Sequence, residues 1–203
     1  MAPLALPALD GLNWSKIRAL AKERAVAAPA DEVVAAALPL LDAPDAPHRM
    51  LAVYLLGYTA GAQPEHLAVL RERAAPDASW EVQEALAQAF DATCAARGYE
   101  AALPLIDDWL AGAHPNTRRA VSEGLRPWTA KARPYFARHP EEAIRRLAAL
   151  RRDASEYVRH SAGNALRDIR RTHGALVDAE TATWDLDDPR EAYTYARVLK
   201  AQR

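Results

Sequence analysis

Apolar residues recur along this chain with the spacing of an amphipathic α-helix. In roughly ten segments they fall at positions i, i+3, i+4 and i+7, which lie on one helix face. Short stretches rich in Pro, Gly, Asp or Asn separate these segments, for example DAPDAPH (42–48), AAPDAS (74–79), GAHPN (112–116) and HPEE (139–142). No segment has the alternating pattern of a β-strand, so we predict an all-α chain.

The helical segments repeat. Segment 114–126 (HPNTRRAVSEGLR) aligns with 79–91 (SWEVQEALAQAFD) at a shift of 35 residues and with 155–167 (SEYVRHSAGNALR) at a shift of 41, and a weaker copy, HRMLAVYLLG, lies 34 residues before the first. The apolar positions then coincide in three sets: Leu86 with Val121 and Ala162, Ala89 with Gly124 and Ala165, and Phe90 with Leu125 and Leu166. Helix pairs that repeat at this length are typical of HEAT-like α-solenoids.

We therefore predict a HEAT-like α-solenoid, an α-α superhelix of about five to six helix pairs. It should form a single domain over residues 1–203, with its clearest repeats from about 45 to 175. We expect the second helices of the pairs to line one concave face.

Polar positions coincide in the same alignment. One row holds Glu84, Arg119 and His160, the next holds Gln88, Glu123 and Asn164, and Asp168 lies one turn beyond Asn164. Because residues i and i+4 lie on one helix face, stacked repeats would join these rows into a polar strip. In solenoids the concave surface that carries such a strip binds partners.

Charge is distributed unevenly, although the net charge is only −1. Residues 1–114 carry 8 Lys and Arg against 15 Asp and Glu, residues 115–172 carry 14 against 6, and residues 173–203 carry 4 against 6. In the middle segment 13 of the 14 basic residues are arginine, whose guanidinium can donate two parallel hydrogen bonds to a phosphate. Either this segment binds nucleic acid, or its arginines form a solvated helical surface with Arg–Glu pairs.

The composition excludes several classes of protein. No apolar run reaches the roughly 20 residues of a membrane-spanning helix, and the N-terminus MAPLALPALDGL lacks the basic region of a signal peptide. The single cysteine, Cys94, cannot form an internal disulfide, and the six histidines do not pair at metal-ligand spacing. We expect a cytoplasmic monomer with no metal, no cofactor and no membrane partner.

Three strings resemble the HEAT-like DNA alkylation repair family, which includes the AlkD and AlkC glycosylases. They are SWEVQE (79–84), PNTRRAVSEGLRPW (115–128) and SEYVRHSAGNALRDI (155–169), and the resemblance extends loosely from about residue 45 to 175. It implies a concave, basic surface that cradles double-stranded, alkylated DNA. It also implies excision of N3- or N7-alkylated purines without full flipping of the base into a pocket.

Residue by residue, the resemblance implies roles for the polar rows. Trp80 and Glu84 resemble the Trp and the acidic residue one turn later that face the damaged nucleotide. Arg119 resembles the arginine that holds the DNA backbone near the lesion, while Glu123 and Asp168 match acidic positions of the AlkC-type pattern. The catalytic candidates are Glu84, Asp168 and Glu123, and the DNA-binding candidates are Trp80, Arg118, Arg119, Arg126, Arg159, His160 and Asn164.

The chemistry explains why carboxylates are candidates. An N3- or N7-alkylated purine is cationic and already a good leaving group, so the enzyme must mainly stabilise the oxocarbenium character of the deoxyribose. A carboxylate near C1′ does this and orients water, and the face of Trp80 adds cation–π attraction of roughly 0.5–2 kcal/mol. AlkD, however, has a second Trp where this chain has Asn164. The alternative function is a non-catalytic HEAT-repeat scaffold that binds branched or damaged DNA, or a protein partner.

Each candidate also has a structural interpretation. Arg119 and Glu123 have the spacing of an intrahelical ion pair worth about 0.2–0.5 kcal/mol. A core position would explain Trp80, and a contact with an arginine of another repeat would explain Asp168. For the remaining aromatic residues we predict core positions at Trp14, Trp109 and Trp184, packing at Tyr54 and a turn anchor at Trp128.

Overall fold

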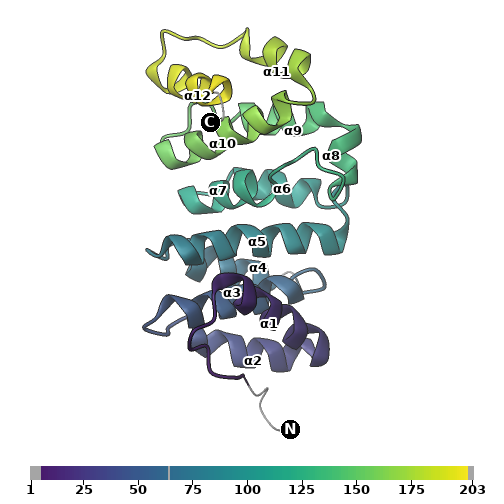
Figure 1. Cartoon of the computed structure of the whole chain (residues 1–203), viewed down its shortest axis with the longest axis vertical. Helices are drawn as coiled ribbons and strands as arrows, with labels where there is room; N and C mark the ends of the chain where they lie inside the picture. The colour runs from purple at the N-terminus through teal and green to yellow at the C-terminus, as the bar shows by residue number, and fades with distance from the viewer. Residues whose placement is uncertain (1–5, 64, 201–203) are drawn as a thin grey trace. The chain divides into compact units, whose positions relative to one another are not determined.

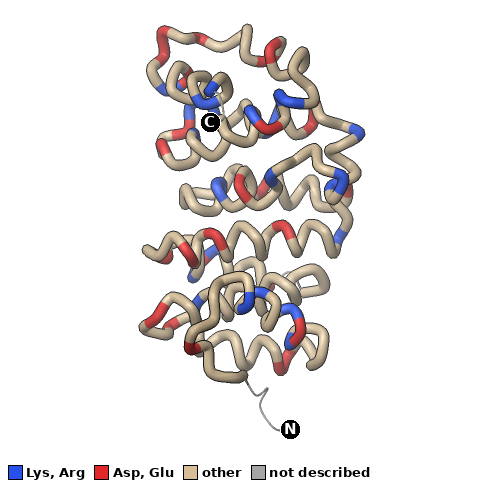
Figure 2. Tube along the Cα trace, viewed as in Figure 1, with Lys and Arg blue, Asp and Glu red and all other residues tan. Residues whose placement is uncertain are grey.

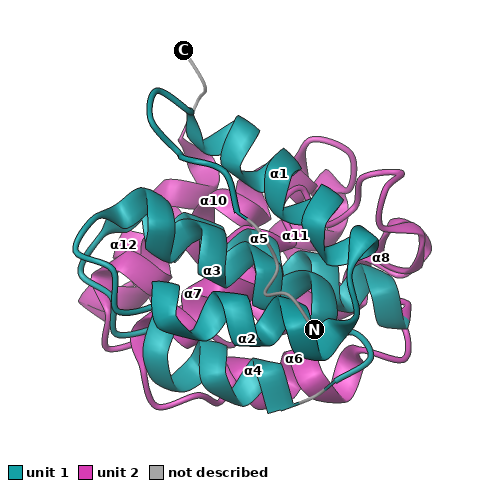
Figure 3. Cartoon of the chain, turned by 90° about the horizontal axis from the view of Figure 1, so that it is seen from below, with its two compact units in different colours: residues 1–97 teal, residues 98–203 magenta. Residues whose placement is uncertain are grey.

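Every regular element in the described residues is helical. The computed structural model describes residues 6–63 and 65–200, and neither range contains a strand, which confirms the all-α prediction. The chain divides into two compact units, residues 1–97 and 98–203 (Figure 3). Unit 1 contains α1 (Trp14–Ala27), α2 (Ala30–Leu40), α3 (Ala46–Thr59), α4 (Glu65–Val69), a π-helix η1 (Leu70–Ala74) and α5 (Trp80–Arg97). Unit 2 contains α6 (Leu103–Leu110), α7 (Pro115–Gly124), α8 (Pro134–Arg138), α9 (Pro140–Ala148), α10 (Glu156–Arg170), α11 (Gly174–Thr181) and α12 (Pro189–Leu199).

In unit 1, α3 is the central helix. It packs against α1, α2 and α5 (Figure 1), and all of its residues from Met50 to Gly57 are buried. Gly57 lets α5 approach α3 closely, because a Cβ at this position would clash with the Cα and Cβ of Ala89. The Thr93 hydroxyl donates to the Gly57 carbonyl at 3.1 Å. The α3–α5 contact is therefore fixed by backbone proximity as well as by apolar packing.

In unit 2, α10 has the central position. It contacts α7, α9, α11 and α12 (Figure 1). Gly163 lies at the contact with α12, where a Cβ would come within 2.6 Å of the Arg197 Cβ and 2.9 Å of the Thr194 carbonyl oxygen. A glycine here allows two neighbouring helices to pack at a distance that no other residue permits.

The second helices of the pairs share one hydrogen-bonding arrangement at their N-terminal ends. In α3, the Arg49 guanidinium donates to the carbonyls of Ala43 and Pro44 and to the Asp77 carboxylate. In α7, the Arg118 guanidinium donates to the carbonyls of Gly112 and Ala113 and to the Asp153 carboxylate. Both aspartates also accept a backbone N–H two residues later, at Ser79 and Ser155 respectively. Each arginine thus stabilises the loop before its own helix and binds the loop before the next repeat's second helix.

Gln83 in α5 and Arg159 in α10 also donate to backbone carbonyls of the loop before their own helix. The Gln83 amide donates to the Asp77 carbonyl at 2.9 Å, and Arg159 donates to the carbonyls of Asp153 and Ala154. The repeat alignment places Arg49, Gln83, Arg118 and Arg159 in one row. We call these four residues the loop-anchoring row, since they hold the turns that precede the second helices.

The repeat-based predictions of helices and core are confirmed. The four aligned segments form α3, α5, α7 and α10, and the aligned apolar residues Leu86, Val121 and Ala162 are fully buried. Trp109 and Trp184 are buried as predicted, Tyr54 is packed in the core, and the lone Cys94 is buried in α5. Trp128, predicted to anchor a turn, is fully buried after α7 and donates its indole N–H to the Ser122 carbonyl. The core position predicted for Trp14 is wrong, because 55% of this side chain is exposed near the start of α1.

Residues 6–63 and 65–200 include no helix that combines the length and the apolarity needed to cross a membrane. Each of the two units has its own buried core. That the units form one domain stays a prediction.

Candidate nucleic-acid interface

Trp80 and Glu84 lie together in unit 1. Trp80 is the first residue of α5, and Glu84 follows one helical turn later. Both line a hollow of about 380 Å³, whose wall also includes Trp14 of α1 and Met50 and Tyr54 of α3. The Trp80 side chain is 64% exposed, which contradicts the interpretation of Trp80 as a core residue. The predicted pairing of an aromatic face with a carboxylate is therefore present at one hollow.

The wall of this hollow is held by hydrogen bonds between three helices. Gln88 of α5 accepts at its side-chain oxygen from the Tyr54 hydroxyl at 3.2 Å and from the Arg18 guanidinium of α1 at 2.8 Å. Burial raises the pKa of Tyr54 well above its ordinary value, although the nearby positive charge of Arg18 lowers it. The Tyr54 hydroxyl therefore stays protonated and donates to Gln88 at neutral pH.

The hollow combines aromatic faces with negative charge. Trp14, Tyr54 and Trp80 supply the aromatic rings, and Glu81 and Glu84 supply the carboxylates. Aromatic faces attract cations through their quadrupole, and carboxylates attract them by charge. A flat, cationic group of small size matches this lining chemically.

A second group of candidates meets in unit 2 around Arg126. Its guanidinium donates to Glu123 at 2.8 Å and to Asp168 at 2.7 Å and 3.0 Å. Ser161 donates to the other Glu123 oxygen at 2.8 Å, and Ser122 donates to Ser161 at 2.8 Å. Burial opposes the charged form of Arg126, but the two carboxylates outweigh it and raise the pKa of Arg126. The structural interpretation of Asp168, a contact with an arginine of another repeat, describes this geometry.

The Arg119 side chain is buried and does not extend into solvent. Only 5% of it is exposed, and its guanidinium carbon lies 4.2 Å from the centre of the Tyr157 ring. Tyr157 itself is 43% exposed on α10. A phosphate contact by Arg119 stays a prediction.

Arg118 and Arg159, two further DNA-binding candidates, belong to the loop-anchoring row. Arg118 forms two hydrogen bonds with Asp153, at 2.6 Å and 2.8 Å, and these raise its pKa despite burial. Arg159 is 8% exposed, and its guanidinium carbon lies 5.3 Å from the centre of the Tyr193 ring. Sequence alignment shows that both arginines share a row, but it does not reveal that the row points to backbone carbonyls.

Ion pairs within the chain are frequent among the arginines between residues 115 and 172. Figure 2 shows acidic residues interleaved with basic ones along unit 2. Ion pairs hold Arg118, Arg126, Arg145, Arg146, Arg151, Arg152 and Arg170. The excess positive charge of this segment is thus largely met by carboxylates of the same chain, as the alternative interpretation of the charge pattern expects.

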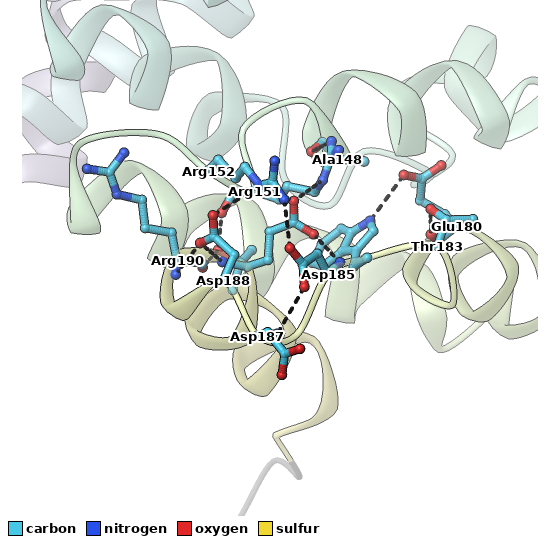
Figure 4. A network of polar contacts seen from close by, with 12 residues as sticks. Ala148, Arg151, Arg152, Glu180, Thr183, Asp185, Asp187, Asp188 and Arg190 are labelled. Carbon is cyan, nitrogen blue, oxygen red and sulfur yellow. Dashed lines mark hydrogen bonds and ion pairs between the residues drawn. The ribbon is translucent and has the colours of Figure 1, made fainter.

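The network in Figure 4 shows how such pairing works at the end of unit 2. Arg151 donates to the buried Glu191 carboxylate at 3.0 Å, and Arg152 pairs with the same carboxylate and with Asp185 and Asp188. The second Glu191 oxygen accepts the backbone N–H of Asp185 at 2.8 Å. This network attaches α12 and its preceding loop to the turn after α9.

His160 and Asn164 are half-buried on α10. Burial lowers the pKa of His160, and the positive charge of Arg197 lowers it further, so the imidazole is neutral at neutral pH. Among the described residues, no group of three His, Cys, Asp or Glu side chains is arranged to hold a metal ion.

The candidate residues are divided between the two units. Unit 2 brings Glu123, Arg126 and Asp168 together, whereas Trp80 and Glu84 belong to unit 1. Their union in one polar strip stays a prediction.

Comparisons with known proteins give a consistent result. The family model described as DNA alkylation repair enzyme matches residues 8–196. The crystal structure of AlkD2 from Streptococcus mutans is 40% identical, with a TM-score of 0.90 over 95% of this chain and 91% of that one. The structure of smu.31 from Streptococcus mutans is 38% identical, with a TM-score of 0.84 over 92% of this chain and 96% of that one. Comparison with curated proteins gave no significant match.

A more distant structure shares the fold. Pseudomonas fluorescens AlkC, an alkylpurine DNA glycosylase bound to DNA containing an abasic site analog, is 22% identical, with a TM-score of 0.52 over 95% of this chain and 64% of that one. Together with the high TM-score to AlkD2, this likeness confirms the predicted HEAT-like fold class.

Proposed function

Because the chain belongs to the DNA alkylation repair enzyme family, we propose that it is a DNA glycosylase that binds double-stranded DNA and excises cationic N3- or N7-alkylated purines. The observation that carries this proposal is the hollow at Trp80 and Glu84, where aromatic rings and carboxylates line one space of about 380 Å³. Such a lining favours a flat cation over a neutral base, and alkylation is what makes a purine cationic.

In the proposed reaction, the bond between the purine nitrogen and C1′ of the deoxyribose breaks. The departing base takes the electron pair of that bond and leaves neutral, while positive charge develops on the sugar. The Glu84 carboxylate stabilises this charge, and a water molecule adds its oxygen to C1′ and gives up one proton. The products are a free base and an abasic site.

Glu84 is the leading carboxylate of the proposal. Glu84 lines the same hollow as Trp80, whereas Glu123 and Asp168 are held by Arg126 in unit 2. Catalytic roles for Glu123 and Asp168 stay predictions that rank below the role of Glu84.

The proposal is tested with duplex DNA that contains 7-methylguanine or 3-methyladenine. We expect the parent protein to release free base in a single-turnover assay, and Glu84→Gln to slow release by roughly 10²–10³-fold with DNA affinity unchanged or slightly raised. Glu72→Gln, which removes a carboxylate from exposed Glu72 of η1 outside the hollow, should excise base at the parent rate. Equal rates for parent and Glu84→Gln would remove Glu84 from the mechanism.

A second candidate function is recognition of alkylated DNA without excision. The ion pairs of Glu123 and Asp168 with Arg126 favour it, since they engage carboxylates that the family resemblance assigns to catalysis. This function predicts tighter binding to alkylated than to unmodified duplex, with no free base released by the parent. The same assay therefore separates the two candidates.

A further inference from the structure

A second hollow in unit 1 adjoins the one at Trp80. Its volume is about 650 Å³, and it shares Trp14 and Gln88 with the first hollow. Their other lining residues differ in charge. The first has Glu81 and Glu84, whereas the second has Arg18 and Lys22 of α1. Two hollows of opposite charge, which share Trp14 and Gln88, therefore lie along α1.

Three residues of α1 face this pair of hollows with regular spacing. Trp14, Arg18 and Lys22 are four residues apart, so they form one stripe along the helix. All three are exposed, while Ile17 and Ala21 are buried and hold α1 against the rest of the unit. The stripe is thus presented on the outside of a helix that is anchored by its other face.

The exposed Trp14 and the placement of Arg18 point to a binding role for the stripe. A tryptophan that leaves 55% of its surface in water forgoes much of the free energy that its burial would supply. Arg18 is held by its hydrogen bond to Gln88, the residue common to both hollows. Asp91 also lines the second hollow, so that hollow still has one more cationic than anionic side chain.

We propose that α1 binds the DNA strand beside the damaged base, with Arg18 and Lys22 each receiving one of two consecutive backbone phosphates at the second hollow and Trp14 separating phosphate from base. This proposal rests on the proposed function for the first hollow. The charges assign the two occupants: Glu81 and Glu84 repel a phosphate from the first hollow, and Arg18 and Lys22 repel a cationic base from the second. A nucleotide with a cationic base carries these two charges in the same arrangement.

The test measures equilibrium binding of the full chain to duplex DNA, unmodified and with 7-methylguanine, over a range of salt concentrations. The slope of log K against log salt is negative, and each lost phosphate contact lowers its magnitude by about 0.9. We expect Lys22→Gln to lower the magnitude of the slope by about 0.9 and the double variant Arg18→Gln/Lys22→Gln by about 1.8 on both duplexes. Lys16→Gln, which removes an exposed α1 charge outside both hollows, should keep the parent slope.

Thermal unfolding of each variant shows whether the fold is kept, and Lys22→Gln is the main test because it leaves the Arg18–Gln88 hydrogen bond in place. Equal slope changes for Lys16→Gln and Lys22→Gln, or no change for Lys22→Gln, would overturn the proposal. Binding does not depend on excision. If the parent releases no free base but Lys22→Gln lowers the magnitude of the slope, the glycosylase proposal is contradicted and the phosphate proposal is supported. If the parent releases free base but Lys22→Gln leaves the slope unchanged, only the phosphate proposal is contradicted.

Discussion

At the scale of single residues, arginines that look alike in the sequence have different roles in the structure. Arg118 and Arg126 bind carboxylates that lie 35 and 42 residues further along the chain. Lys22 and Arg18, which carry less weight in a charge census, line a hollow instead. The number of basic residues in a segment therefore says little about which of them meets a ligand.

Arg118 gives a direct test of this difference. Removing its guanidinium leaves the Asp153 carboxylate and two loop carbonyls without their donor, so Arg118→Gln should lower the free energy of unfolding by about 1–3 kcal/mol. Because the side chain is already engaged within the protein, the salt dependence of DNA binding should stay at the parent value. Urea unfolding measures the predicted loss of stability, and a salt titration of DNA binding checks that the salt dependence is unchanged.

The control is Lys131→Gln, which removes an exposed positive charge from the same arginine-rich segment. It should change the free energy of unfolding by less than about 0.5 kcal/mol. A lower salt slope in Arg118→Gln with unchanged stability would restore Arg118 as a phosphate contact.

Glu142 of α9 gives a pH-dependent prediction. Hydrogen bonds from Arg146 and then Arg145 hold the pKa of Glu142 below its ordinary value of 4.5. A carboxyl with a depressed folded pKa contributes stability that is present above its unfolded pKa, here about 4.5, and is lost as the pH falls through the lower folded pKa. Glu142→Gln should therefore be about 0.5–1 kcal/mol less stable than the parent at neutral pH, and this difference should shrink toward zero at acidic pH.

Urea unfolding of both proteins at each pH measures this difference. Glu100→Gln, at an exposed position before α6, should show no difference from the parent at either pH. A gap between Glu142→Gln and the parent that persists at low pH would mean that lost packing, and not the ion pairs, causes the destabilisation.

The sequence predicted which helix face each polar residue occupies but not which partner it finds. The spacing of Glu123 predicts an ion pair with Arg119, whereas Glu123 binds Arg126 and Ser161; that Glu123 also faces a ligand stays a prediction. Such partners depend on how neighbouring repeats dock and which rotamers fit, and a periodic pattern contains neither. Opposite charges separated by about one repeat, as in Arg118 and Asp153, are a signal that could have been used.

At the scale of elements, two glycines test the packing of α10. Gly163→Ala places a Cβ within 2.6 Å of Arg197 and 2.9 Å of a backbone oxygen, so α10 and α12 must move apart. We expect a loss of about 1–3 kcal/mol in the free energy of unfolding. Gly174→Ala, where a Cβ meets no atom within 4 Å, is the matched control and should be neutral or stabilise by about 0.4–1 kcal/mol.

Equal stability of these two variants in urea would show that the α10–α12 contact is looser than Gly163 indicates.

The repeat helices themselves were predictable, since α3, α5, α7 and α10 carry aligned apolar positions. Helix α1 lies before the repeats, and its short buried side, Ile17 and Ala21, gives a weak pattern. That pattern does not indicate which face Trp14 occupies, which explains why its predicted core position was wrong.

At the scale of the whole molecule, the net charge of −1 and the many internal ion pairs bear on DNA affinity. The concentrated arginines alone would predict a very steep salt dependence. Because seven of them are held by ion pairs in unit 2, we expect fewer phosphate contacts and a slope of log K against log salt of roughly −2 to −5 for unmodified duplex. A slope steeper than about −7 would mean that paired arginines exchange their carboxylates for phosphates on binding.

The burial of Cys94 has a consequence for survival of the protein in the conditions that its proposed substrates imply. The electrophiles that methylate purine nitrogens also attack thiolates, which are stronger nucleophiles than any purine. The only thiol of the chain is fully buried in α5, out of reach of such a reagent in the folded protein. Under the proposed function, folding therefore shields this thiol from the chemicals that create the protein's substrates.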